Sequence, residues 1–308
     1  GVHRGGWLWR AGARHAMPPL CLLLFVLFLQ EQEKNIENEK LIVILRGVEK
    51  EKLIPLVNAM YEGGIRLMEI TYDAKGNTTD EETARNIEML ATHFEGKMYV
   101  GAGTVLTPKQ VELTAKAGGR FIISPDTCEE VINKTRELQM VSIPGALTPT
   151  EIQMAHRFGA DFVKMFPITT LGTDYVKAIK APLSHIKLLA VGGINENNME
   201  GYLKVGISGF GIGADIVNNK LIENNEFDKI RDIAAKYNVS ESAIIAANNL
   251  NDGKIKNRQK LIIPTEEYAM ELAPEQQEVE VAQTEEEENM DLETAFDEKT
   301  EEDSSAFI

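Results

Sequence analysis

The sequence predicts an α/β fold, a (β/α)8 TIM barrel, over residues 38–237. From Leu41 onwards, short apolar runs that end in Gly, Thr, Asp or Pro alternate with amphipathic stretches. Runs that are apolar on both faces indicate parallel strands covered by helices. There are eight such runs, which favours a closed barrel. A doubly wound open sheet is the alternative, and it is weakened because no GxGxxG motif follows the first run.

The elements can be assigned in order along the chain. The expected strands cover residues 41–46, 66–72, 98–104, 120–124, 140–144, 161–166, 187–192 and 208–213. The expected helices include residues 79–94, 107–117, 148–158, 195–204 and, as the last barrel helix, 226–237. Several of them start at a capping residue followed by Pro or Glu: Thr107-Pro108, Thr148-Pro149 and Asn195-Glu196.

Residues 1–37 differ in composition from the barrel and are expected to form a leader outside it. The apolar run at 18–29 is too short for a bilayer span of roughly 20 residues, but it has the length of a signal-peptide core. No small-residue cleavage site follows it, so a non-native leader and a real anchor both remain open. We expect a cytoplasmic protein, with membrane association or export as the alternative if the run is a real signal.

The C-terminal part changes character again. Residues 238–264 belong to a segment, starting near Ile233, whose IAAKYNVS and QKLIIP motifs resemble the greater part of a lysin-motif (LysM) domain. The resemblance implies binding to peptidoglycan or chitin. The opening strand of that family is missing, however, and Phe227–Ile230 is a poor substitute. Residues 265–308 carry 17 Asp and Glu with one Lys, a composition typical of an acidic disordered tail.

Charge and cysteine content exclude several classes of function. The acidic tail accounts for the whole formal net charge of -16, so residues 1–264 are neutral overall. No basic patch predicts binding to nucleic acid. The only cysteines, Cys21 and Cys128, give no disulfide framework, and no Cys/His spacing suggests structural zinc.

Lys164 is the first candidate catalytic residue. It lies in the apolar stretch 162–167, which predicts a buried strand with Phe162, Lys164 and Phe166 on one face. Burial disfavours the ammonium form, and an amine with a depressed pKa can form a Schiff base with a ketone. The alternative is that the ammonium group reaches solvent at the strand end.

Three further polar residues lie at or near the carboxyl ends of expected strands. Arg46 ends the first strand, Glu69 lies late in the second, and Thr104 ends the third. In a barrel these ends converge on one face, where catalytic groups lie. Each residue alone has a structural explanation, such as a pairing of Glu69 with Arg66 or Lys164. Together with Lys164 they predict an active site.

Glycine-rich turns follow the seventh and eighth expected strands. Gly192 and Gly193 lie where the seventh strand ends, and Gly211 and Gly213 lie at the end of the eighth. Glycines at these positions let backbone N–H groups approach a phosphate, and these two loops are the usual phosphate site of such barrels. Tight turns alone are the alternative explanation.

Seven motifs in order carry a resemblance to a known family. They are ILRGV with Arg46, MEIT with Glu69, GAGTVLTP (101–108), ISPD (123–126), IPGALTPTE (143–151), VKMFP (163–167) and AVGGI (190–194). Residues 38–237 thereby resemble the KDPG/KHG aldolases, class I enzymes that cleave 2-keto-3-deoxy-6-phospho-sugar acids and related 4-hydroxy-2-oxo acids to pyruvate and an aldehyde.

The resemblance implies roles for individual residues. Lys164 is the Schiff-base lysine, Glu69 the acid and base, and Arg46 with Thr104 binds the pyruvate carboxylate. The remaining expected substrate-binding residues are Pro125, Val191, Gly192, Gly193, Gly213 and Ala214. The resemblance implies no metal, no cofactor besides the covalent Lys164 Schiff base, a small 2-oxo acid as substrate and a homotrimer.

Three departures from the family pattern bear on the substrate. Asp73 stands where many gluconate-type members have a phosphate-binding Arg, and Ala214 stands where a Ser is common. Val191 is similar to the galactonate-type branch, whereas gluconate-type members tend to have Thr there. We therefore expect a galactonate-type preference or relaxed C4 stereochemistry, with reduced dependence on phosphate because Asp73 would repel it. The alternative functions are a LysM-type glycan binder with an inactive barrel, and a phosphate-binding isomerase or synthase.

Overall fold

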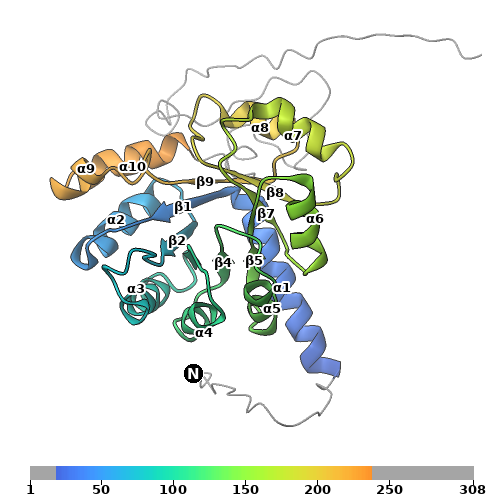
Figure 1. Ribbon diagram of the computed structural model, residues 1–308. Coiled ribbons are helices and arrows are strands. Elements are labelled where there is room, and N and C mark those ends of the chain that lie inside the picture. The colour runs from blue at the N-terminus through green and yellow to red at the C-terminus, as the bar shows by residue number, and fades with distance from the viewer. Residues whose placement is uncertain (1–18, 238–308) are drawn as a thin grey trace, which may run out of the picture.

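The computed structural model describes residues 19–237, and these form a parallel α/β barrel (Figure 1). The strands are β1 Leu41–Leu45, β2 Leu67–Thr71, β3 Tyr99–Gly103, β4 Phe121–Ile123, β5 Val141–Ile143, β6 Gly145–Ala146, β7 Val163–Met165, β8 Leu188–Val191 and β9 Gly209–Ile212. They pair in the order β5-β4-β3-β2-β1-β9-β8-β7-β6, with every pair parallel. The predicted fold class is confirmed.

The expected fifth strand is divided into two, which corrects the prediction of one strand over residues 140–144. β5 and β6 lie on either side of Pro144, which has no N–H to donate to a neighbouring strand. β5 pairs with β4, whereas Gly145 and Ala146 of β6 pair with Lys164 and Met165 of β7. Residues 141–146 therefore pair with β4 on one side and with β7 on the other, and these pairings close the barrel.

Helices surround the strands on the outside (Figure 1). They are α2 Lys50–Glu62, α3 Asp80–His93, α4 Pro108–Lys116, α5 Glu129–Glu137, α6 Pro149–Arg157, α7 Gly172–Lys180, α8 Met199–Lys204, α9 Asn219–Glu223 and α10 Phe227–Lys236. Thr107 and Thr148 cap α4 and α6 as expected, each within a reciprocal capping box.

The predicted start of α8 at Asn195 is wrong. The Asn195 side chain accepts a hydrogen bond from the Asn197 backbone N–H at 3.0 Å, which forms a turn instead of a helix cap. The helix itself begins at Met199, after Asn198. An Asn that bonds two residues ahead offers the backbone an alternative to the helix, and this explains the shorter element.

Alternation along the strands separates an inner core from an outer one. The inner cluster consists of Ile36, Ile42, Leu67, Phe121, Ile123, Val141, Ile143, Phe162 and Leu189. Alternate strand residues such as Val43, Met68 and Val163 belong to a second cluster, which the surrounding helices share. The inner cluster fills the amino-terminal end of the barrel, so space for a site remains at the carboxyl end.

Helix α1 (Pro19–Glu39) corrects our expectation that residues 1–37 lie outside the fold. Its Ile36 is 2% exposed and belongs to the inner cluster, where it closes the amino-terminal end of the barrel. Lys187 pairs with Glu33 at 3.2 Å and with Glu37 at 2.8 Å, which fixes the helix from outside. Among the described residues, no helix is both long enough and apolar enough to cross a bilayer.

The last described helix belongs to the barrel, as predicted for residues 226–237. A Cβ on Gly63, which directly follows α2, would lie only 2.6 Å from the Cβ of Ala234, so α10 packs directly on the end of α2. Phe227–Ile230, the poor substitute for a LysM opening strand, form the start of this helix. The expected LysM-like segment at 238–264, the acidic tail at 265–308 and the first 18 residues lie outside the described part of the chain.

Candidate active site

Glu69 is a buried carboxyl group in the middle of β2. Its side chain points into the barrel and is 2% exposed. A Cβ on Gly103 of the neighbouring β3 would lie 2.5 Å from the Glu69 carboxyl carbon, so only glycine leaves room for the carboxyl group. The Glu69 Oε2 atom has no hydrogen-bond partner among the described residues. Burial raises the pKa of Glu69 to about 7, opposed by the nearby charges of Lys164 and Arg46.

Lys164, in the middle of β7, is the second buried ionisable group of this interior. Its side chain is 9% exposed, so the alternative in which its ammonium group reaches solvent does not hold. Burial lowers the pKa of Lys164; the Glu69 charge opposes this shift and the Arg46 charge adds to it. The Lys164 Nζ lies 4.8 Å from the centre of the Phe166 ring. A neutral amine is thereby favoured beside a carboxyl group that can hold a proton.

Arg46 and Thr104 lie together just beyond the ends of β1 and β3. Arg46 Nη2 donates to Thr104 Oγ1 at 3.4 Å. Thr104 has a φ of 55°, an unusual conformation for a threonine, directly after the glycine that packs on Glu69. The exposed Arg46 guanidinium provides a positive charge near both Glu69 and Lys164. The structure thus brings together the four predicted residues Arg46, Glu69, Thr104 and Lys164.

Arg66 is not the partner of Glu69. Its guanidinium Nη1 donates to the Tyr61 carbonyl at 2.8 Å and to the Ile65 carbonyl at 2.9 Å. The guanidinium also lies 4.3 Å from the centre of the Tyr61 ring. Arg66 precedes β2, at the opposite end of the strand from the site. A structural ion pair with Arg66 therefore does not explain the burial of Glu69.

The glycine-rich turns lie at the same end of the barrel. Gly192 and Gly193 follow β8 with φ values of 95° and 74°, which favour glycine. A Cβ on Gly193 would lie 2.5 Å from Thr169 Oγ1, and the Thr169 hydroxyl donates to the Gly192 carbonyl at 2.9 Å. The backbone N–H groups of Gly193 and Ala214 have no carbonyl partner within the described range. They can donate to an anion.

The remaining predicted residues border this site. Val191 is 6% exposed, and its Cγ2 atom lies 2.9 Å from the position of a Cβ on Gly211, so its side chain faces β9 inside the barrel. The exposed Pro125 follows β4, and a Cβ on Gly145 would lie 2.2 Å from its carbonyl oxygen. Gly145 pairs with Lys164, which places Pro125 two strands from the amine. Gly213 follows β9.

Two residues beside the site escaped prediction from the sequence. Phe166 is 44% exposed although it is a large aromatic residue, and its ring lies next to the Lys164 amine. Side chains alternate along the expected strand in residues 162–167, which places Phe166 on the same face as Lys164. This alternation is the signal from which its position beside the amine could have been predicted. Thr169 has no such signal, because its contact with Gly192 depends on how two loops fold together.

Asp73 is bound within the loop that follows β2. Its carboxylate accepts hydrogen bonds from the backbone N–H groups of Lys75 (2.9 Å), Asn77 (2.8 Å) and Thr78 (3.1 Å). These bonds, led by that of Lys75, lower the pKa of Asp73. The carboxylate therefore organises the loop after β2, and its lowered pKa keeps it negatively charged. The expected repulsion of a substrate phosphate by Asp73 therefore stays a prediction.

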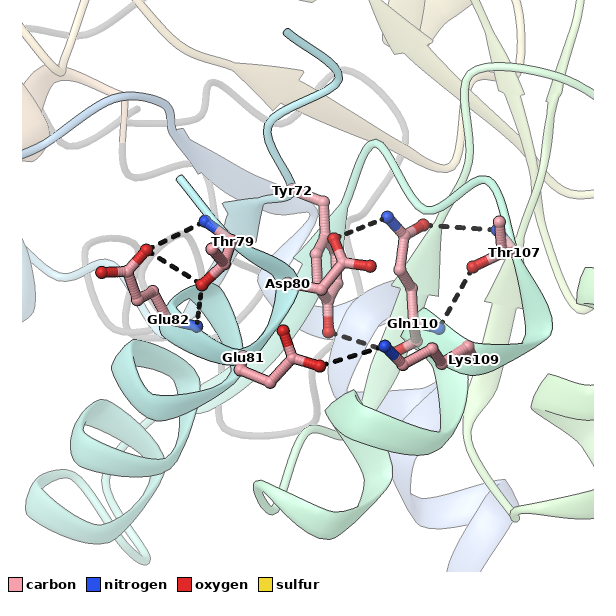
Figure 2. A network of polar contacts seen from close by, with 8 residues as sticks. All are labelled: Tyr72, Thr79, Asp80, Glu81, Glu82, Thr107, Lys109 and Gln110. Carbon is pink, nitrogen blue, oxygen red and sulfur yellow. Dashed lines mark hydrogen bonds and ion pairs between the residues drawn. The ribbon is translucent and has the colours of Figure 1, made fainter. Parts of the chain in front are cut away.

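A polar network connects the loops after β2 and β3 (Figure 2). Gln110 of α4 accepts from the backbone N–H groups of Leu106 and Thr107 at 2.8 and 3.3 Å through Oε1, and its Nε2 donates to Asp80 of α3 at 3.0 Å. The Tyr72 hydroxyl, directly after β2, donates to the Gln110 carbonyl at 3.1 Å. The network holds the segment that follows Thr104 against the start of α3.

The chain is similar to known proteins over most of the barrel. The family described as "KDPG and KHG aldolase" matches residues 32–233. A probable 2-dehydro-3-deoxy-6-phosphogalactonate aldolase of Rhizobium meliloti is 37% identical over 57% of this chain and 81% of its own length. The 2-dehydro-3-deoxy-6-phosphogalactonate aldolase of Escherichia coli is 34% identical over 57% of this chain and 83% of its own length.

A solved structure and a second family complete the comparison. The KDPG aldolase of Legionella pneumophila, solved with pyruvate captured as a covalent carbinolamine intermediate, is 29% identical with a TM-score of 0.60, covering 66% of this chain and 96% of the other. The LysM domain family matches residues 228–264, which overlap α10. Because the first family match spans well over half of the sequence, the chain belongs to the KDPG and KHG aldolase family.

Proposed function

We propose that this chain is a class I aldolase that reversibly cleaves a 2-keto-3-deoxy-6-phospho-sugar acid, or a related 4-hydroxy-2-oxo acid, to pyruvate and an aldehyde. The burial of the Lys164 amine beside the Glu69 carboxyl group carries the proposal. A buried lysine with a lowered pKa is a nucleophile for ketones, and a neighbouring acid with a pKa near neutrality can both give and take protons. Such a reaction makes the chain a carbon–carbon lyase.

The reaction starts at the substrate ketone. The neutral Lys164 amine attacks C2 and gives a carbinolamine. Protonated Glu69 donates its proton to the carbinolamine hydroxyl, which leaves as water, and an iminium ion remains on Lys164. The ionised Glu69 then takes the proton of the C4 hydroxyl. The C3–C4 bond breaks, its electron pair moves to the iminium group as an enamine, and the aldehyde leaves.

Glu69 also completes the cycle. It returns its proton to C3 of the enamine, which restores an iminium ion, and water then hydrolyses this ion to pyruvate and free Lys164. Arg46 and Thr104 are suited to bind the pyruvate carboxylate, because the exposed guanidinium carries donors that match a carboxylate and the Thr104 hydroxyl lies beside it. The chemistry requires neither a metal nor a separate cofactor.

A phosphate at the far end of the substrate is proposed to bind the turns after β8 and β9. The N–H groups of Gly193 and Ala214 point to this role, because they lack carbonyl partners within the described range. Because Asp73 keeps its negative charge in the loop after β2, we propose that turnover depends less strongly on this phosphate than it would with a basic residue there. The apolar Val191 supports a galactonate-type or C4-relaxed preference.

Pyruvate release measured with lactate dehydrogenase tests the proposed function. The two C4-epimeric 6-phospho acids, each also supplied without phosphate, should give turnover with the wild type and none with Lys164→Ala. Phosphate binding without release of pyruvate from any of the four compounds would support the alternative of an isomerase or synthase.

The LysM match supports a second candidate function for residues 228–264, binding of peptidoglycan or chitin. The first matched residues form barrel helix α10, so a complete binding module cannot use them as a strand. Retention on insoluble peptidoglycan that is lost when the chain ends after Asn238 would establish this function. A homotrimer and a cytoplasmic location remain predictions, to be checked by light scattering and by fractionation.

A further inference from the structure

Two side chains hold successive carbonyl groups of the glycine turn after β8. The Thr169 hydroxyl, from the loop after β7, donates to the Gly192 carbonyl at 2.9 Å. The Nδ2 atom of Asn198, directly before α8, donates to the Gly193 carbonyl, also at 2.9 Å. The Oδ1 atom of the same amide accepts from the Asn195 N–H at 3.0 Å, which fixes the amide's orientation. Both peptides of the turn are therefore held by side chains from outside it.

These two bonds determine where the N–H groups of the turn point. The Gly192 carbonyl and the Gly193 N–H belong to one trans peptide, so they point in opposite directions. The same holds for the Gly193 carbonyl and the Ile194 N–H. Neither N–H has a carbonyl partner among the described residues. Binding of the carbonyls therefore directs two free donors away from Thr169 and Asn198.

The order of the strands shows what lies on the other side. β8 pairs with β7 on one side and with β9 on the other. Because Thr169 belongs to the loop after β7, a Gly193 N–H that points away from it points toward the turn after β9. In that turn the Ala214 N–H likewise lacks a carbonyl partner within residues 19–237. The two turns can therefore donate to one anion between them.

The glycines make the turn dependent on these side chains. Gly192 and Gly193 have φ values of 95° and 74°, and a glycine pair can adopt many other conformations at little cost. The Ile168 N–H donates to the Val191 carbonyl at 3.2 Å, but this bond precedes both glycines. A Cβ on Gly193 would lie 2.5 Å from Thr169 Oγ1, so the hydroxyl occupies the space that a side chain would need. The glycine and the threonine hydroxyl therefore fit only together.

We propose that Thr169 and Asn198 are positioning residues for the substrate phosphate. Neither side chain has to touch the phosphate. Each binds one end of a glycine peptide, and the N–H at the other end of that peptide donates to the phosphate. The inference rests on the proposed function and adds the residues that keep its phosphate site in place. Loss of either side chain should weaken phosphate binding and leave the reaction at Lys164 unaffected.

Steady-state kinetics with a phosphorylated substrate and its unphosphorylated counterpart test the proposal. Thr169→Val removes the donor and keeps the branched shape. We expect the KM of the phosphorylated substrate to rise about threefold to tenfold, the effect of one lost hydrogen bond, with kcat nearly unchanged. The KM of the unphosphorylated substrate should stay at the wild-type value, which also shows that the variant is folded. Asn198→Ala should act in the same way, and Thr169→Ser should behave like the wild type because it keeps a hydroxyl.

Thr170→Val and Asn197→Ala are the matched controls. Thr170 is the exposed neighbour of Thr169, and its hydroxyl donates to the Pro167 carbonyl at 3.3 Å instead of to the glycine turn. Asn197 is the exposed neighbour of Asn198. Both variants should leave the two KM values unchanged.

Calorimetric titration of the full chain with inorganic phosphate gives a readout that does not depend on turnover. We expect saturable binding by the wild type, weakened about threefold to tenfold in Thr169→Val and unchanged in Thr170→Val. Failure of the aldolase function would remove the turnover but not this binding. Three results would overturn the proposal: no phosphate binding by the wild type, equal binding by the wild type and Thr169→Val, or an equal rise in the KM of both substrates. The last would mean that Thr169 supports the whole site.

Discussion

The Glu69 carboxyl group and the Lys164 amine share the carboxyl end of the barrel interior, and each opposes the pKa shift that burial causes in the other. Burial disfavours the carboxylate of one and the ammonium of the other, so the neutral forms are stabilised together. A neutral amine and a protonated acid are the states with which formation of a Schiff base begins. The pair thus combines a nucleophile with a proton donor.

The two residues should differ in what their replacement abolishes. Lys164→Ala should remove covalent adduct formation altogether. Glu69→Gln should still form the adduct slowly while turnover falls by about 10²–10⁴-fold, the usual contribution of a positioned acid or base. Single-turnover trapping and steady-state kinetics on both variants measure this. Equal loss of trapping in both would mean that Glu69 only supports the lysine.

The raised pKa of Glu69 predicts a pH-dependent stability. The folded state keeps the Glu69 proton up to a pH of about 7, whereas the unfolded chain loses it near the ordinary value of 4.5. The folded state therefore binds more protons in this window, and the Glu69 contribution to stability is lost as the pH rises from about 4.5 to about 7. The loss is about 3 kcal/mol, at 1.36 kcal/mol per pKa unit.

Urea unfolding at pH 4.5 and pH 8 checks this expectation. Glu69→Gln should lose less stability than the wild type between the two values, whereas Glu51→Gln, a change in an exposed carboxyl group of α2, should follow the wild type. Parallel pH curves for the wild type and Glu69→Gln would contradict the assigned pKa shift.

Gln110 is predicted to be a positioning residue for the carboxylate-binding pair. Gln110→Glu keeps an acceptor for the N–H groups of Leu106 and Thr107 but cannot donate to Asp80. Loss of that bond frees the segment after Thr104, so we expect the KM for the 2-oxo acid to rise about threefold to tenfold, corresponding to about 1 kcal/mol, with kcat nearly unchanged.

Glu151→Gln is the matched control for this change. Glu151 occupies the same position in the capping box of α6 and accepts from Leu147 and Thr148. Its replacement should leave the KM at the wild-type value. An unchanged KM in Gln110→Glu, or a fall in kcat instead, would exclude the positioning role.

Val191 is expected to determine the stereochemical preference at C4. Threonine at this position would place a hydroxyl group toward the interior beside Gly211. Val191→Thr should shift the ratio of kcat/KM between the gluconate-type and galactonate-type 6-phospho acids by about tenfold toward the gluconate type, the effect of one added hydrogen bond. A wild type that already cleaves only the gluconate-type epimer would contradict this role.

The barrel and its four central polar residues could be predicted from sequence because each signal is local. Two-sided apolar runs predict parallel strands, and the carboxyl ends of such strands meet in a barrel, which brings Arg46, Glu69 and Lys164 to one end. Thr107 and Thr148 are followed by Pro, so their caps were also predictable. The prediction that Asn195 starts a helix was wrong, because its side chain accepts a hydrogen bond within a turn.

The errors concern contacts between distant segments. The docking of α1 depends on the packing of Ile36 into the barrel interior and on the ion pairs of Lys187 with Glu33 and Glu37. These residues are far apart in the sequence, and the apolar run at 18–29 predicts neither contact. The hydrogen bonds of Asp73 were not predictable for a different reason, because their donors are backbone groups of its own loop. Backbone donors carry no residue-type signal.

Reduction with borohydride in the presence of pyruvate tests the central claim most directly. The iminium ion on Lys164 would be reduced to a stable secondary amine, so intact-mass and peptide spectrometry should find a single pyruvyl adduct on Lys164 together with loss of activity. Borohydride without pyruvate is the control and should leave both unchanged. An unmodified Lys164, or an adduct on another lysine, would contradict the assignment of Lys164 as the Schiff-base residue.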